Sequence, residues 1–220
     1  MDAGATDLSD LGFWRLVGRV KRDRQLIERH ADQIGRIDAK AFRARFRLRF
    51  PPWVGLALML AGIATGIAAA WLALAEGRSA AADPTIVGIA SIVAAAMWAA
   101  GVHSFTHYVV GRAVGIRFTD FFAAIPPPPL PGLKTDYATY LRVSPRARVW
   151  MHASGAIATK LAPFLAVIFA VIAEAPAWSV VALVALGTFQ LVTDVVFSAK
   201  SSDWKKVRRE LAVARDTRAR

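Results

Sequence analysis

The sequence predicts an all-α polytopic membrane protein with about four transmembrane helices. Apolar residues make up 55% of the 220 residues, and the mean hydropathy is +0.39. They are gathered into long runs, without the regular apolar and polar alternation of soluble helices and strands. A helix needs about 20 apolar residues to cross about 30 Å of hydrocarbon. Four runs reach that length: residues 53–75, 86–110, 149–172 and 178–197.

The distribution of basic residues predicts the orientation of these helices. Residues 1–50 hold twelve Lys and Arg, residues 111–148 hold six, and the tail from Lys200 holds eight, whereas the other two connections hold only Arg78. Because basic loops stay in the cytoplasm, we expect both termini on the cytoplasmic side of the cell membrane. The net charge of +12 resides in these flanks. It therefore favours contact with anionic lipid headgroups, and not binding of nucleic acid.

The first fifty residues are expected to form a basic amphipathic helix outside the membrane. Apolar residues recur at steps of three and four from Phe13 to Ala41, with Arg and Lys on the opposite face. Such a helix lies on the membrane, pairs with a partner helix or is simply solvated. Residues 42–50 fit both a strand, by alternation, and a helical face, by their phenylalanines. In either case their arginines are expected to meet lipid phosphates.

The connection between the second and third runs is expected to begin as a short strand over residues 115–122. The stretch from Pro126 to Gly132 must be extended, because consecutive prolines lack backbone donors. Ser144 and Pro145 suit the first positions of the third helix. The expected organisation is a basic N-terminal region, a transmembrane domain and a basic tail helix: residues 1–50, 51–199 and 200–220.

Two histidines near the end of the second run are the strongest candidates for chemistry. Because His103 and His107 are four residues apart, they share one helical face and can reach one ion, as in H-E-x-x-H zinc sites. Ser104 stands where those sites carry the glutamate that takes the proton from metal-bound water. The chain has no cysteine, so a third ligand must be His, Asp or Glu. Asp194, at a similar depth in the fourth run, and Asp203, just beyond it, are candidates.

These residues also have interpretations that involve no metal. The histidine pair could hydrogen-bond to neighbouring helices, although ionisable groups inside a membrane are usually functional. Asp203 could simply favour the positive end of the tail helix, beside a capping Ser201 or Ser202. His152 is expected at the interface, because it lies within a turn of the cytoplasmic edge at Arg148.

The order of these parts over residues 85–210 resembles the site-2 proteases, which are intramembrane zinc peptidases. His103-Ser-Phe-Thr-His107 with the later Gly115-Ile116-Arg117 is similar to the family's H-E-x-x-H helix and the strand start after it. Ser154-Gly155-Ala156 resembles the Gly-Pro motif, and the segment around Asp203 resembles the Leu-Asp-Gly-Gly-Arg-Val region. Three departures accompany the match: Ser104 replaces Glu, Ala156 replaces Pro and Trp204 replaces Gly.

The resemblance implies a zinc ion held by His103, His107 and Asp203, with Asp194 as the alternative third ligand. It also implies that the connection pairs with an unwound transmembrane substrate, with substrate contacts at Asp194, Phe118 and Pro126. A stiff cytoplasmic linker is the alternative interpretation of that connection.

The lost glutamate favours a catalytically impaired relative that binds or regulates a transmembrane protein. One alternative is an active zinc protease that uses another base. A second is a b-type haem protein ligated by His152 together with His103 or His107, because two histidines on one helical face cannot bind opposite faces of a haem. The sequence leaves the substrate and the oligomeric state open.

Overall fold

A computed structural model describes residues 8, 10–124, 130–196 and 202–217. It divides the chain into two units assembled from segments far apart in the sequence. Unit 1 comprises Met1–Gly55, Tyr108–Met151 and Val207–Arg220, and unit 2 comprises Leu56–His107 and His152–Lys206. The organisation expected from the sequence, with regions 1–50, 51–199 and 200–220, stays a prediction.

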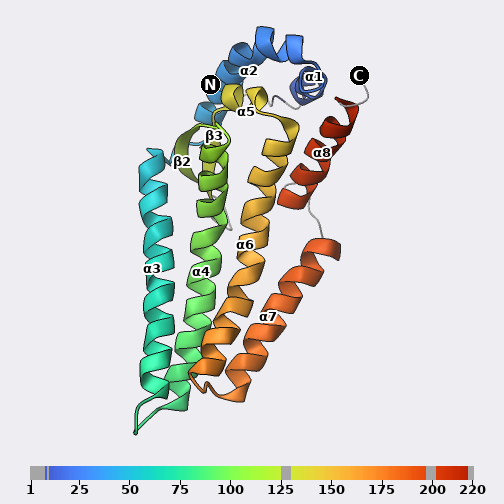
Figure 1. The fold of residues 1–220 in the computed structure, drawn as a ribbon. Helices are drawn as coiled ribbons and strands as arrows, with labels where there is room; N and C mark the ends of the chain where they lie inside the picture. Colours follow the sequence, from blue (N-terminus) through green and yellow to red (C-terminus); the bar gives the residue numbers. More distant parts are fainter. Residues whose placement is uncertain (1–7, 9, 125–129, 197–201, 218–220) are drawn as a thin grey trace. The chain divides into compact units, whose positions relative to one another are not determined.

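Most of unit 2 consists of four long helices that lie side by side in Figure 1: α3 (Pro52–Gly77), α4 (Pro84–Ala113), α6 (Pro145–Ile172) and α7 (Ala177–Val196). In the described part of the chain, α3, α4 and α6 are long and apolar enough to cross a membrane. The apolar helix α7 is shorter, so the count of four spans stays a prediction, as does their orientation. Three of these helices begin at a proline, which suits the first helical position because no backbone donor is needed there.

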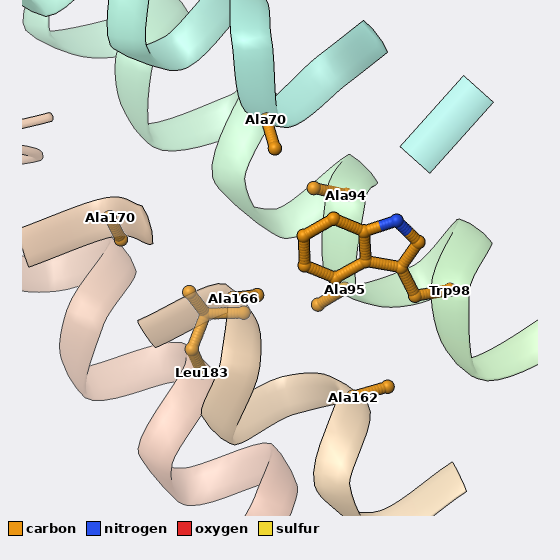
Figure 2. Packing of buried hydrophobic residues seen from close by; sticks show 8 residues of the cluster. All are labelled: Ala70, Ala94, Ala95, Trp98, Ala162, Ala166, Ala170 and Leu183. Atoms are coloured by element: carbon orange, nitrogen blue, oxygen red, sulfur yellow. The ribbon is translucent and has the colours of Figure 1, made fainter. Parts of the chain in front are cut away.

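Small residues let the helices of unit 2 approach closely. Figure 2 shows the indole of Trp98 among alanines, and a Cβ added at Gly66 would lie only 2.4 Å from that indole. Close packing of small residues is the usual basis of helix association in membranes, where lipid removes the hydrophobic driving force. The packing positions α4 and α6, which carry most of the candidate site. The buried cluster contains Ala70, Ala94, Ala95, Trp98, Ala162, Ala166, Ala170 and Leu183.

The N-terminal region of unit 1 forms two helices, α1 (Phe13–Val20) and α2 (Arg24–Arg45), where the sequence predicted one. Asp23 between them has an extended backbone, and its carboxylate accepts hydrogen bonds from the backbone N–H groups of Gln25 and Leu26. A side chain in this role begins a new helix. The apolar spacing continues across Asp23, so periodicity alone did not indicate the break.

A three-stranded antiparallel sheet in unit 1 has the order β1 (Arg49–Phe50), β2 (Phe118–Ala124) and β3 (Leu130–Thr135). The ambiguous segment 42–50 adopts both predicted forms, since α2 continues to Arg45, Phe46 has an extended backbone and Arg49–Phe50 form β1. The rings of Phe42, Phe46 and Phe122 pack with centroids between 4.7 and 5.0 Å apart. The phenylalanine spacing therefore serves packing inside unit 1.

A buried carboxylate holds the part of helix α8 (Asp203–Asp216) that belongs to unit 1. Glu210 accepts hydrogen bonds from Lys21 Nζ at 2.5 Å, Arg148 Nε at 2.6 Å and the Tyr140 hydroxyl at 3.0 Å. Burial alone would raise the pKa of Glu210, but the charges of Lys21 and Arg148 outweigh it and lower that pKa. Arg148, expected at the cytoplasmic edge, is completely buried in this cluster.

Candidate metal centre

Three potential metal ligands converge in unit 2, two from α4 and one from the first residue of α8. One ligand atom from each of His103, His107 and Asp203 lies within 4.8 Å of the other two. Nε2 of His107 is 3.1 Å, and Nε2 of His103 is 3.4 Å, from the same Asp203 oxygen, Oδ2. A tetrahedral zinc ion with bonds of about 2.0–2.2 Å holds its ligand atoms about 3.3 Å apart. The distances from Asp203 Oδ2 to the two imidazole nitrogens are close to that value.

Thr159 of α6 fixes the orientation of the His103 ring. The Thr159 hydroxyl lies 2.8 Å from the carbonyl oxygen of Gly155 and donates its one proton there. Nδ1 of His103 lies 2.8 Å from the same hydroxyl oxygen, so the ring donates its Nδ1–H to Thr159. In the neutral ring, Nε2 therefore carries the lone pair, and it faces Asp203. A hydrogen bond on the far ring nitrogen is the usual support of a metal-binding histidine.

Gly155 lets α6 approach the histidine pair. A Cβ added at this position would lie 2.4 Å from Nε2 of His107 and 2.7 Å from the backbone oxygen of His103. Any side chain at position 155 would thus force the ring or the helix to move. The geometry gives the reason for a glycine here.

Asp203 lies at the start of α8 and also faces the two histidines, so its position suits both interpretations offered by the sequence. It is the first residue of α8, and the neighbouring Ser202 hydroxyl accepts a hydrogen bond from the Lys205 backbone N–H at 3.3 Å, as a helix cap. Its Oδ2 faces the histidines, while its Oδ1 accepts a hydrogen bond from Lys206 Nζ at 2.9 Å. Burial alone would raise the pKa of Asp203. The hydrogen bond and charge of His107, with the charge of Lys206, instead hold that pKa well below its usual range.

In the described part of the chain, the other predicted site residues are not members of this three-residue cluster. Phe118 lies in β2 of unit 1, where its ring packs 5.3 Å from that of Tyr108. Asp194 belongs to α7, but its side chain lies outside the described residues, as does Pro126 altogether. His152 has its ring centroid 6.4 Å from that of His107.

Thr159 and Lys206 contact the site but were not predicted from the sequence. A threonine inside an apolar helix normally bonds its own backbone, as Thr159 also does, so the sequence carries no signal for its second contact. Lys206 could have been found, because it follows Asp203 by three residues and thus lies on the same face of a helix.

No protein-family model matches the chain, and no curated protein or solved structure matches it significantly. The chemistry of the site is therefore inferred from its own residues.

Proposed function

We propose that His103, His107 and Asp203 bind a divalent transition-metal ion, most naturally zinc, within a membrane-embedded protein. One observation carries the proposal: two imidazole nitrogens face a single carboxylate oxygen at 3.1 and 3.4 Å. The Nε2 lone pair of His103 and the oxygen lone pair repel each other unless a cation lies between them. A metal ion satisfies all three ligands at once, whereas without one His103 must first take up a proton at Nε2 before it can hydrogen-bond to Asp203.

The donor set also supports zinc over haem. Two imidazoles and a carboxylate leave a fourth tetrahedral position for water or another ligand, which is the composition of many zinc sites. A haem iron would need an imidazole on each face of the porphyrin. Both Nε2 atoms of the α4 histidines instead turn toward Asp203.

We propose that the protein resembles a site-2 protease that lacks the glutamate acting as general base. A bound zinc ion would lower the pKa of a coordinated water, but the Ser104 hydroxyl cannot accept the proton as a carboxylate does. General-base help is typically worth about 10²–10⁴-fold in rate. Among the described residues, the ligand cluster contains one carboxylate, Asp203, and it serves as a ligand. We therefore propose weak or absent proteolysis, and a role in binding or regulating a transmembrane protein client.

The proposed setting is the cell membrane, with four spans and both termini in the cytoplasm. The long apolar helices and the asymmetry of basic residues support this arrangement. The ligands of α4 lie toward its C-terminal end, which the orientation would put near the cytoplasmic face.

Metal analysis of the purified full-length protein tests the proposal. We expect about one zinc per chain in the wild type, and loss of the metal in His103→Ala, His107→Ala and Asp203→Ala, since two remaining ligands rarely retain zinc. His152→Ala is the matched control, because His152 is close to His107 but outside the three-ligand group. Wild-type protein that cannot be loaded with a transition metal would contradict the proposal, as would equal loss in the control.

Two further measurements separate the alternatives. A Soret band in the visible spectrum of the purified protein would favour the haem protein. Robust cleavage of a reconstituted single-span reporter, lost in His103→Ala, would identify an active protease that uses another base.

A further inference from the structure

Three arginines directly before the first long apolar helix have no carboxylate partner in the described part of the chain. Arg43 and Arg45 end α2, Arg47 follows in the extended segment, and all three are exposed. Other arginines of unit 1 form ion pairs, as Arg22 does with Asp216 at 2.8 Å and Arg142 with Asp32 at 2.7 Å. The three positive charges are therefore available to an anion from outside the chain.

The chain holds these arginines close to the start of α3. Arg47 precedes Pro52 by five residues, and an extended chain covers at most about 3.6 Å per residue, so their backbones are within about 18 Å. The segment is also tied down, because β1 pairs with β2. A Cβ at Gly55 would lie 2.4 Å from the Phe121 ring, so the first turn of α3 packs on β2. The segment cannot swing far from the point where α3 begins.

Exposed apolar side chains accompany the arginines. Leu48 is 46% exposed, Phe50 is 44% exposed and Trp53 is 67% exposed. In water, three exposed apolar side chains of this size so close in the sequence would favour association with other molecules. At a membrane surface they fit the boundary between headgroups and acyl chains, where tryptophan is enriched and arginine reaches the phosphates.

We infer that residues 43–53 form a binding surface for anionic phospholipid headgroups. Arg43, Arg45 and Arg47 take the phosphates, because the planar guanidinium group donates two parallel hydrogen bonds to an oxyanion. Leu48, Phe50 and Trp53 enter the acyl boundary beside them. The excess of three positive charges selects a lipid with net negative charge over a zwitterionic one. This surface is independent of the proposed metal.

Native mass spectrometry of the full-length protein in detergent tests the inference, with phosphatidylglycerol and phosphatidylcholine titrated separately. We expect wild type to retain phosphatidylglycerol preferentially. Each basic residue strengthens attraction to an anionic surface about fivefold, so Arg43→Gln, Arg45→Gln and Arg47→Gln together should weaken retention by up to about 100-fold. The corresponding triple lysine variant, which keeps the charge, should retain most of the binding.

The charge-matched control is the triple variant Arg24→Gln, Arg29→Gln and Arg36→Gln. These exposed residues of α2 are more distant in the sequence from α3 than the three arginines of the proposed surface. Equal losses in the two glutamine triples would overturn the inference, since net charge alone would then explain binding. Equal retention of both lipids by wild type would also overturn it. The inference would also be overturned if inorganic phosphate displaced more lipid than chloride does at equal ionic strength. If the glutamine triple does not fold, Arg45→Gln and Arg47→Gln singly should each weaken retention about fivefold.

Discussion

Replacing Gly155 by alanine would perturb the proposed metal centre without removing a proposed ligand. The added Cβ would lie 2.4 Å from Nε2 and 2.5 Å from Cε1 of His107. Comfortable carbon contacts are about 3.5–4.0 Å, so the ring or α6 must move by about 1 Å. Overpacking of this kind costs about 1–3 kcal/mol, and metal sites tolerate deviations of only about 0.2 Å in bond length. If the strain falls on the ligands, zinc affinity should decrease about 10–100-fold.

A competition titration with a chromophoric zinc chelator measures this change in affinity. Gly62→Ala is the control, because a Cβ there would meet its nearest atom, in Gly101, at an ordinary 3.6 Å. Thermal unfolding of both metal-free variants separates a general loss of stability from a specific loss of affinity. Unchanged zinc affinity in Gly155→Ala, with normal folding, would refute the view that close approach of α6 positions His107.

Three other substitutions test separate parts of the account. Thr159→Val removes the acceptor for the far nitrogen of the histidine ring and should weaken zinc binding about 10–100-fold, whereas Thr159→Ser should not; equal affinities would contradict the assigned hydrogen bond. Glu210→Gln leaves the Lys21 and Arg148 side chains without their carboxylate and should lower the free energy of unfolding by about 3–5 kcal/mol. The control is Glu28→Gln, which removes an exposed ion pair with Arg24 within one helix and should cost at most about 0.5 kcal/mol. The pKa of Glu210 is lowered on folding, so the ionised carboxylate stabilises the fold fully above the unfolded-state pKa of about 4.3. This stabilisation is lost as pH falls through the folded-state pKa. Denaturant unfolding should therefore show the stabilities of wild type and Glu210→Gln converging at acid pH. Ser104→Glu should keep the proposed metal and create an H-E-x-x-H motif. Cleavage of a single-span reporter by wild type as fast as by this variant would show that the carboxylate is immaterial.

Features that depend on neighbouring residues were predictable from the sequence, and features that depend on distant packing were not. Runs of about 20 apolar residues suffice to predict long helices, and a spacing of four suffices to place His103 and His107 on one face. The third residue of the cluster, Asp203, lies 96 positions beyond His107. Comparison of membrane depth left two candidates, and the resemblance favoured Asp203.

Local sequence patterns do not predict the contacts that support the site and unit 1. Thr159 looks like any threonine within an apolar helix, and nothing near Lys21 or Arg148 indicates that both pair with Glu210. The break between α1 and α2 could have been predicted from Asp23, because aspartate is a preferred helix cap. Continuous apolar spacing outweighed that signal. Burial of a charged cluster depends on three segments packing together, which no single segment encodes.

The central proposal is that two imidazoles and one carboxylate hold a metal ion, and X-ray absorption at the zinc edge tests it most directly. For protein loaded with one equivalent of zinc, the account predicts scattering from two imidazole rings at about 2.0–2.1 Å and from oxygen at about 2.0–2.2 Å. Asp203→Ala should change the oxygen shell or release the ion. Zinc bound without imidazole scattering, or a failure of wild type to bind one equivalent, would contradict the account.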